Sequence, residues 1–238
     1  MRAQSSTLVI IPIHNEEESI GGVITEIRTK ASNCDILVVN DASTDNGPRI
    51  SKELGVPVLD LPINLGIGGA VQTGFILAKV KDYDIVVQVD GDGQHDPSFI
   101  NDLTAPITAG KADISIGSRH LYDHNPAASI TRRMGIRFFS WLTSNLTSAP
   151  ISDCSSGFRA LNRKAYTLFS HDYPTDFPDA EALISAHRAG LKICEIPARF
   201  RERDHGKSSL RPWRLVYYPF KESFSILMKL TTKRGIAA

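Results

Sequence analysis

The alternation of apolar, β-branched runs with longer amphipathic segments is the feature of this sequence that most restricts its fold. Runs such as TLVIIPI and DILVVN predict strands at 7–13, 35–40, 57–61, 84–89 and 112–116. The segments between them have helical spacing and predict helices at 16–30, 47–54, 69–80 and 97–109. A repeated strand–helix unit needs right-handed crossovers and gives a parallel sheet. We therefore predict an α/β fold.

This repetition stops near residue 120, where polar loops, a basic helix and a short return strand at 192–196 follow. Neither a linker nor an internal repeat divides the chain. We predict one domain over residues 1–210, with a nucleotide-type half at about 7–119 and a substrate-shaping half at about 120–210. An amphipathic helical tail is expected at 211–238.

Composition excludes several classes of protein. The chain of 238 residues has a formal net charge of +1, with 22% charged and 42% hydrophobic residues. This balance argues against disorder and against nucleic-acid binding by bulk electrostatics. Cys34, Cys154 and Cys194 are too scattered for a disulfide framework or a zinc site, which fits a reducing cytosol. There is no signal-peptide pattern, and no apolar run approaches the ~20 residues of a membrane-spanning helix, so we expect no membrane crossing.

Two carboxylates stand at the end of the most apolar run. Residues 86–92 read VVQVDGD, so one glycine separates Asp90 from Asp92. Strand alternation would point both side chains the same way at the edge where α/β sheets bind ligands. A hard divalent cation that bridges phosphates is the natural occupant of such a pair. The alternative is a pair of solvated loop residues or a helix N-cap.

Polar clusters also follow the other predicted strands. Glu16 and Glu17 follow the first strand, residues 41–45 the second, glycines at 66–69 the third, and Arg119 the fifth. Each has an ordinary explanation, such as an Asx-turn, a helix cap, a tight turn or a surface charge. A binding or catalytic rim would explain all of them at once. That rim would collect Asp41, Asp45, Asp90, Asp92 and Arg119.

The glycine cluster does not indicate a dinucleotide or P-loop protein. A dinucleotide fingerprint requires GxGxxG directly after the first strand. Here Gly66 and Gly68 follow the third predicted strand, and Val71 occupies the position of the last glycine. No GxxxxGK[ST] sequence occurs.

Several motifs, in order, resemble those of family 2 glycosyltransferases of GT-A fold. In the first half these are IPIHNEE (11–17), VNDASTD (39–45), NLG (64–66) and DGD (90–92). The second half is similar to the branch that makes polyprenyl- and dolichyl-phosphate sugars, through GSR (117–119), RR (132–133), ISDCSSGFR (151–159), DAE (179–181) and RDHGKS (203–208). The resemblance runs from about residue 7 to 210. His14 stands where the family usually has tyrosine, and Ile136 where the branch tends to have serine.

The resemblance implies a Rossmann-like GT-A domain that binds a UDP- or GDP-linked sugar together with Mg²⁺ or Mn²⁺. Asp92 would be the most direct metal ligand, with Asp90 as its partner and Gln94 in support. Pro12, Asn15 and Glu17 would line the nucleoside pocket, and Asp41 would hydrogen-bond the base or ribose. The whole donor-binding set would be Pro12, Asn15, Glu17, Asp41, Asp45, Gly66, Asp90 and Asp92.

The same resemblance implies an acceptor site for a polyprenyl (undecaprenyl or dolichyl) phosphate. Guanidinium groups bind phosphate bidentately, and the less favoured alternative for any one of these arginines is a solvated surface charge. The acceptor-phosphate set would be Arg119, Arg132, Arg133, Arg203, Lys207 and Ser208. The catalytic set would be Asp153, Asp92 and Arg119. A phosphate acceptor is already ionised, so Asp153 would orient it, whereas a hydroxyl acceptor would require Asp153 as a base.

Two segments combine aromatic and basic residues at helical spacing, which is typical of helices in a membrane interface. One lies at 132–141, and the other begins at Trp213 and continues through Phe224. Packing on the domain or a homodimer seam is the alternative. We expect a peripheral enzyme on the cytoplasmic face of a membrane that binds no nucleic acid and can form a homo-oligomer.

The favoured reaction is an inverting, metal-dependent transfer of a sugar to a polyprenyl phosphate. The first alternative is transfer to a hydroxyl of a glycan or lipid-linked saccharide. The second is a non-catalytic subunit that binds a nucleotide sugar, although such a protein needs no complete metal site. A nucleotidyltransferase is less favoured, because the glycine- and lysine-rich N-terminal loop expected of that class is absent.

Overall fold

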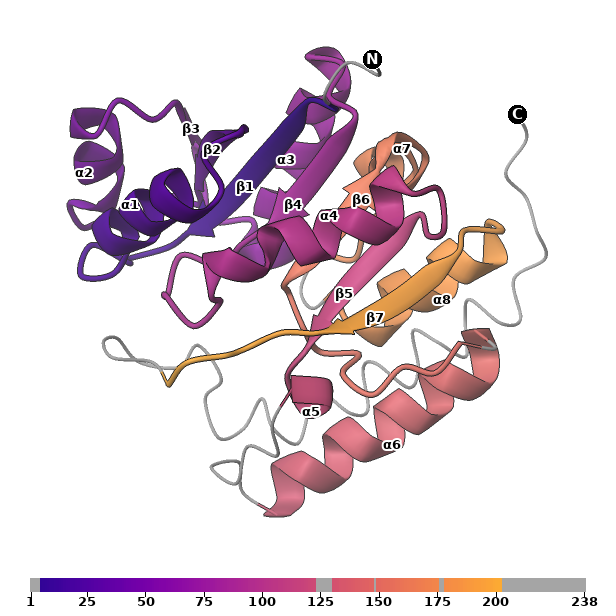
Figure 1. Cartoon of the computed structure of the whole chain (residues 1–238). Coiled ribbons are helices and arrows are strands. Elements are labelled where there is room, and N and C mark those ends of the chain that lie inside the picture. Colours follow the sequence, from indigo (N-terminus) through magenta and orange to yellow (C-terminus); the bar gives the residue numbers. More distant parts are fainter. Residues whose placement is uncertain (1–4, 123–129, 148, 176–177, 203–238) are drawn as a thin grey trace.

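A seven-stranded sheet forms the centre of the molecule (Figure 1). The computed structural model describes residues 5–122, 130–147, 149–175 and 178–202. The strands are β1 (Thr7–Ile13), β2 (Cys34–Asn40), β3 (Val58–Asp60), β4 (Ile85–Gln88), β5 (Ile114–Ser118), β6 (Arg159–Asn162) and β7 (Ile193–Pro197). The helices are α1 (Ile20–Lys30), α2 (Gly47–Glu53), α3 (Gly66–Val80), η1 (Pro97–Phe99), α4 (Ile100–Thr108), α5 (Arg119–Tyr122), α6 (Ile130–Thr147), α7 (Arg163–His171) and α8 (Ala180–Arg188).

The sheet has the order β3-β2-β1-β4-β6-β5-β7 and is parallel except for β6. Because β6 is antiparallel to both β4 and β5, those two strands run in the same direction. The carboxyl ends of six strands therefore meet at one edge. This confirms the predicted α/β fold with a mostly parallel sheet.

Helices cover both faces of the sheet, which explains why its strands are continuous apolar runs. Leu8 and Ile10 of β1 belong to one core, together with Phe75 of α3. Val9 and Ile11 of the same strand belong to a second core with residues of α1 and α4. Figure 1 shows α1 and α4 in front of the sheet and α3 behind it. The strict alternation along β1 thus supplies both hydrophobic layers.

The structure differs from the sequence prediction mainly in its second half. β6 was not predicted, because a strand of four residues with an arginine at one end and an asparagine at the other has no apolar run. It pairs with β4 and β5, so it joins the two halves in one sheet. The predicted tail at 211–238 lies outside the described residues. No helix in the described part of the chain is both long and apolar enough to span a membrane.

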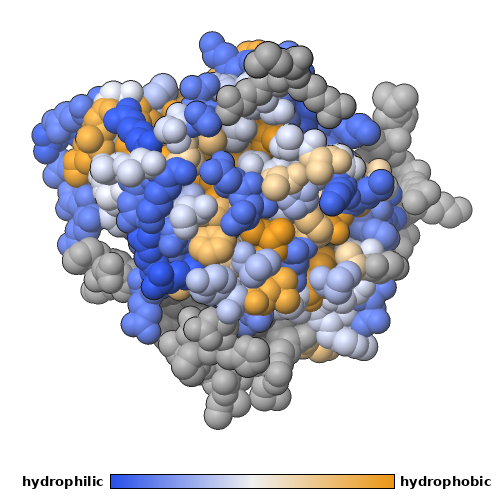
Figure 2. All heavy atoms as spheres, viewed as in Figure 1, coloured by the Kyte–Doolittle hydropathy of each residue, from blue (hydrophilic) through white to orange (hydrophobic). Residues whose placement is uncertain are grey.

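β7 forms one edge of the sheet and is only half-buried along most of its length. Figure 2 shows apolar residues reaching the surface near the middle of this face, where β5 and β7 lie in Figure 1, while hydrophilic residues gather over α1. After β7 the chain crosses the carboxyl edge of the sheet. There Ala198 donates its N–H to the carbonyl of Ser118, and Phe200 forms a bridge with His95.

The start of α3 packs directly on the chain at 174–175. The N–H of Gly68 donates to the carbonyl oxygen of Thr175 at 2.9 Å. A Cβ at Gly68 would lie 2.0 Å from the oxygen of Pro174 and 2.4 Å from that of Thr175. Both atoms are backbone, so neither can move aside cheaply.

We therefore expect Gly68→Ala to destabilise the protein by roughly 2 kcal/mol or more, because overpacking against backbone forces the two segments apart. Equilibrium denaturation measures this. Gly22→Ala in α1 is the matched control, since a Cβ there meets nothing within 4 Å. It should be neutral or stabilising by about 0.5 kcal/mol. Equal stability of the two variants would contradict the tight contact.

Candidate active site

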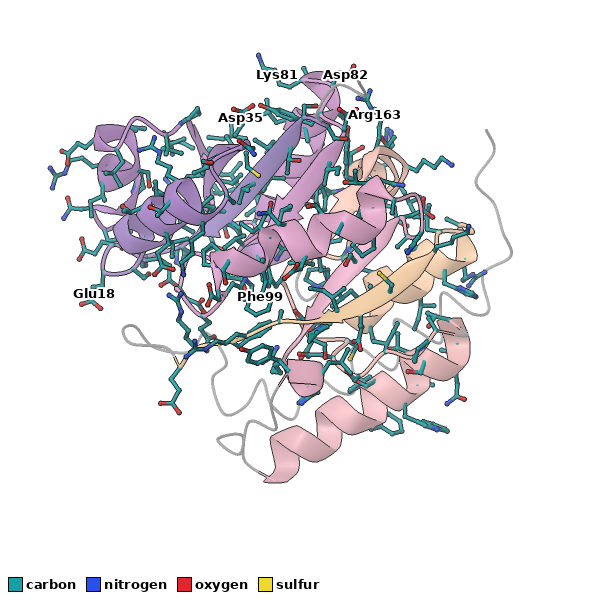
Figure 3. The ribbon with its side chains drawn as sticks, viewed as in Figure 1. Glu18, Asp35, Lys81, Asp82, Phe99 and Arg163 are labelled. Carbon is teal, nitrogen blue, oxygen red and sulfur yellow. The ribbon has the colours of Figure 1, made fainter. Side chains whose placement is uncertain are left out.

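The carboxyl edge of the sheet gathers the predicted site residues. Asp41 follows β2, Asp90 follows β4, and Arg119 begins directly after β5. The opposite edge carries a separate ion pair between Arg163 and Asp82. Figure 3 shows these two side chains together at the amino end of β4, far from Phe99 beyond the carboxyl end of that strand. This second pair is therefore remote from the site.

The loops after β1 and β2 hold each other through their side chains. Asn15 has a φ of +60°, and its carbonyl Oδ1 accepts the N–H of Thr44 at 2.8 Å. Asp45 accepts the N–H of Glu17 at 2.8 Å, while Glu17 accepts the N–H of Asn46 at 3.0 Å. This backbone N–H of Asn46 is the main reason that the pKa of Glu17 lies below its ordinary value. Three predicted donor-binding residues are thus brought together and fixed.

Asp41 connects the end of β2 to the start of α3. Its side chain is buried, and its two oxygens accept the N–H groups of Leu65 at 2.6 Å and Gly66 at 2.9 Å. Gly66 begins α3 with a φ of +80°. Asp41 therefore caps the start of α3 through these two N–H groups. Its contact with a nucleoside stays a prediction. Pro12, at the end of β1, is buried beside Gly91.

His14 contacts the backbone of Asp41 in the same region. Its Nδ1 lies 2.7 Å from the carbonyl oxygen of Asp41 and 3.1 Å from the side-chain nitrogen of Asn64. Its Nε2 lies 3.4 Å from the side-chain nitrogen of Asn15. The imidazole thus takes part in the same hydrogen-bonded region, at the position where the resemblance had led us to expect tyrosine.

The two carboxylates of the DGD motif lie in a turn rather than on the strand. β4 ends at Gln88. Two residues later, the N–H of Asp90 donates to Nδ1 of His95 and not to a neighbouring strand. The strand alternation that we used to align Asp90 with Asp92 therefore does not apply. Asp92 accepts the N–H of Gln94 at 3.0 Å across this turn.

The carboxylate of Asp90 occupies a space beside Gly157 and is supported by Gln88. A Cβ at Gly157 would lie 3.0 Å from Oδ2 of Asp90, so this glycine leaves the space that the carboxylate occupies. Gln88 donates to Oδ1 of Asp90 at 3.3 Å. The side chain of Asp90 is still one-third exposed. It can therefore face a ligand from a supported position.

The donor set fits a divalent cation shared with a diphosphate. In the described ranges no three His, Cys, Asp or Glu side chains cluster closely enough to hold an ion alone. Asp90, Asp92 and the amide oxygen of Gln94 are hard oxygen donors. Mg²⁺ is usually bound by one or two carboxylates plus substrate phosphates and water, and an incomplete protein site of this kind matches that pattern.

Arg119 and Asp153 form a buried ion pair beside this loop. Nε of Arg119 lies 2.6 Å from Oδ2 of Asp153, whose side chain is 0% exposed. The other oxygen of Asp153 accepts the hydroxyl of Ser155 at 3.1 Å. The guanidinium carbon of Arg119 stands 4.6 Å from the ring centroid of Phe200, a cation–π contact. The pair uses Nε, so the NH1/NH2 edge that fits a phosphate is not part of it.

Two residues that the sequence analysis missed hold the loop of Asp153. Glu195 on β7 accepts the N–H groups of Ser152 and Asp153, both at 2.8 Å, and burial raises its pKa. Arg159 is buried and donates to the carbonyl oxygens of Ser156, Cys154 and Pro178. Their signal was only their membership in apolar or motif segments, because their partners are distant or are backbone atoms.

Some predicted acceptor residues cannot be placed. Arg132 and Arg133 belong to the first turns of α6, of which the backbone alone is described. Arg203, Lys207 and Ser208 lie outside the described residues. Their roles stay predictions.

The sequence profile of glycosyl transferase family 2 matches residues 8–169. This range contains the donor-side loops, the DGD turn and the Arg119–Asp153 pair described above. The chain belongs to glycosyl transferase family 2, and it is a glycosyltransferase.

Relatives of similar length have names that specify an acceptor. Polyprenol monophosphomannose synthase of Mycolicibacterium smegmatis is 28% identical over 99% of this chain and 93% of its own length. Undecaprenyl-phosphate mannosyltransferase of Micrococcus luteus is 30% identical, covering 85% of this chain and 86% of its own. A UDP-N-acetylglucosamine–dolichyl-phosphate N-acetylglucosaminyltransferase of Methanococcus voltae is 30% identical over 80% of this chain and 84% of its own.

Solved structures support the fold. Glucosyl-3-phosphoglycerate synthase from Mycobacterium tuberculosis in complex with UDP superposes with a TM-score of 0.75 at 19% identity, covering 100% of this chain and 84% of that one. The same enzyme with Mn²⁺, UDP and glucosyl-3-phosphoglycerate gives a TM-score of 0.73 at 20% identity over the same shares. The GT-A-like architecture expected from the motifs is confirmed.

A charged network anchors the DGD turn to α1. Arg201 pairs with Glu26 through two contacts at 2.7 and 2.8 Å. Its N–H donates to the carbonyl oxygen of Gln94, and its own carbonyl oxygen accepts the side-chain amide of Gln94. Lys30 contacts both Glu26 and Asp96 at 3.1 Å. Burial alone would raise the pKa of Asp96. Hydrogen bonds from Ser98 and Lys30 outweigh burial and lower this pKa to about 2.

This network predicts a loss of stability in acid. A carboxyl whose pKa is depressed on folding stabilises the native state above its unfolded pKa, and that contribution disappears as the pH falls from ~4 toward 2. The contribution of Asp96 is on the order of 2 kcal/mol. Asp96→Asn should therefore unfold more readily at neutral pH and lose less stability on acidification. Denaturation between pH 7 and 2.5 tests this, with Asp102→Asn on the exposed side of α4 as the charge control. An acid-dependence equal to that of the wild type would contradict it.

Proposed function

We propose that this glycosyltransferase moves one sugar, with inversion and with the help of a divalent cation, from a nucleotide sugar to a polyprenyl phosphate. The observation that carries the choice of acceptor is the state of Asp153. Its carboxylate is fully buried, one oxygen contacts Arg119 and the other accepts the Ser155 hydroxyl. The names of the three relatives support the same class of acceptor.

A buried, paired carboxylate is better suited to orient a group than to remove a proton. A hydroxyl acceptor must lose its proton during transfer and needs a base within hydrogen-bond reach. A phosphate monoester is already ionised near neutral pH and needs none. Asp153 instead orients Arg119, whose NH1/NH2 edge can bind the acceptor phosphate bidentately. This arrangement favours the phosphate acceptor over the hydroxyl alternative.

The proposed transfer is a single in-line displacement. An anionic oxygen of the acceptor phosphate forms the new bond to the anomeric carbon of the sugar. The bond from that carbon to the nucleoside diphosphate breaks, and its electron pair leaves on the diphosphate oxygen. No proton is transferred and no bond to the enzyme forms, so the anomeric configuration inverts.

The donor side of the site has two tasks in this scheme. Asn15, Glu17 and Asp41 hold the loops around the nucleoside. Asp90 and Asp92, supported by Gln94, would hold Mg²⁺ or Mn²⁺ together with the diphosphate. The cation supplies positive charge that stabilises the leaving diphosphate more in the transition state than in the ground state. Arg119 lies at the junction between these groups and the acceptor.

α6 is proposed as the surface that meets the membrane. Its hydroxyls face the protein, where Ser140 and Ser144 donate to the carbonyl oxygens of Ser152 and Ile151. Two of its aromatic residues face outward, with Phe138 51% and Trp141 62% exposed, while Phe139 is buried. Exposed Trp and Phe on a helix suit a lipid interface. The scattered cysteines fit the cytoplasmic side, where thiols stay reduced.

The first test is release of nucleoside diphosphate by the purified protein, with Mn²⁺ or Mg²⁺, a panel of UDP- and GDP-sugars, and a short polyprenyl phosphate. Release should depend on the lipid phosphate. Asp92→Ala should lower it by at least ~100-fold with the fold intact, because charge stabilisation at the leaving group is lost. Asp102→Ala, an exposed aspartate on α4, is the matched control.

The outcomes of this experiment separate the candidate functions. Release only with a saccharide acceptor would replace the phosphate acceptor by a hydroxyl and assign Asp153 as the base. Unchanged turnover in Asp92→Ala would remove the metal assignment.

The membrane contact is tested by sedimentation with vesicles of mixed neutral and anionic phospholipid. Replacing both Phe138 and Trp141 by alanine should weaken binding by about tenfold or more, since burying either ring gains roughly 1.5 kcal/mol or more. Val80→Ala is the control, because Val80 is an exposed apolar residue on α3. Undiminished vesicle binding, or conversion of a dimer to a monomer seen by light scattering, would assign this surface to another role.

A further inference from the structure

His95 lies directly beneath the DGD turn, and its imidazole is nearly inaccessible, with 4% of the residue exposed. Its Nδ1 lies 3.1 Å from the backbone nitrogen of Asp90. That nitrogen carries a hydrogen and can only donate, so Nδ1 is an acceptor. The proton of the neutral ring must then reside on Nε2.

The protonated nitrogen of this ring faces the carboxylate. Nε2 of His95 lies 3.5 Å from Oδ2 of Asp90. One imidazole therefore addresses both the backbone and the side chain of the same aspartate. The other oxygen of Asp90 accepts from Gln88, and the missing side chain of Gly157 leaves room for the carboxylate.

Two aromatic rings hold the imidazole in this orientation. Phe158 stacks on it with the centroids 4.8 Å apart and an angle of 16° between the planes, and Phe200 meets it edge-on at 5.0 Å. Phe200 also carries the guanidinium of Arg119 on its ring. The aromatic cluster of His95, Phe158 and Phe200 thus connects the metal-side carboxylate to the acceptor-side arginine.

We propose that His95 is a positioning residue that fixes the carboxylate of Asp90 for the diphosphate-bound cation. This inference rests on the metal role given to Asp90 in the proposed function. The imidazole touches neither the cation nor the substrate. It acts by accepting the Asp90 N–H, which shapes the turn, and by directing Nε2–H toward Oδ2, which sets the rotation of the carboxylate. Groups that orient a ligating carboxylate typically change metal affinity or activity by about 10–100-fold when removed.

Three substitutions separate packing from these two polar contacts. His95→Phe keeps a flat ring for Phe158 and Phe200 but removes both contacts. His95→Asn places an acceptor oxygen near the position of Nδ1, and His95→Gln places a donor nitrogen near that of Nε2. His171→Phe, at an exposed position in α7, is the control for exchanging a histidine for a phenylalanine.

The first readout is Mn²⁺ binding in the presence of UDP, measured from the EPR signal of free Mn²⁺. The second is the split of sugar transfer into kcat and the KM for the lipid phosphate. We expect His95→Phe to weaken Mn²⁺ binding by about tenfold or more and to lower kcat, with the KM for the lipid nearly unchanged. His95→Asn should recover part of the loss, because the turn keeps its acceptor. His171→Phe should match the wild type.

A His95→Phe protein that melts at a lower temperature but binds Mn²⁺ as tightly as the wild type would overturn the inference and leave His95 a packing residue. If His95→Phe does not fold, the Asn and Gln variants decide, and wild-type Mn²⁺ affinity in both would overturn it. Weakened Mn²⁺ binding without any transfer to a polyprenyl phosphate by the wild type would support His95 and reject the proposed acceptor. Absence of Mn²⁺ binding by the wild type would reject the metal role of Asp90 and, with it, the role of His95.

Discussion

The acceptor half of the proposed site depends on one ion pair with a buried carboxylate. The carboxylate of Asp153 is inaccessible to solvent, and an unpaired charge in that position would cost several kcal/mol. Arg119 compensates it at 2.6 Å, and the loop around it is held by Glu195 from β7 and by Arg159 beneath it. β7 lies next to β5 and brings Glu195 to the backbone of this loop. The ion pair also gives the guanidinium a fixed direction relative to Phe200.

The antiparallel strand β6 connects this half to the donor half. Gly157 and Phe158 directly precede it. The first makes room for the carboxylate of Asp90, and the second stacks on His95. A strand placed between β4 and β5 therefore brings the segment 151–159 against the DGD turn. This one insertion therefore sets how the DGD turn lies relative to the Arg119–Asp153 pair.

The sequence predicted the parts of the molecule that local patterns encode. Local patterns located six of the seven strands, with bounds within one residue except for β5, whose two ends were each placed two residues too early. The family motifs indicated the residues at the carboxyl edge. β6 was missed because its identity depends on two neighbours distant in the chain. Glu195 fell within a predicted strand, but its partners are 42 and 43 residues away, which no local pattern reports. The alignment of Asp90 with Asp92 was predicted from a strand that ends two residues earlier than Asp90.

The loops after β1 and β2 are held to each other by their own side chains. Asn15, Glu17 and Asp45 each bond a backbone group of the opposite loop, and Asp41 holds the start of α3. Ordering a flexible residue costs about 1–2 kcal/mol of conformational entropy, and here that cost is met during folding rather than during binding. In the proposed function, a nucleotide in this corner would therefore need few direct contacts. An alanine substitution at any of these residues changes the order of two loops at once, so its effect on affinity measures preorganisation as well as contact.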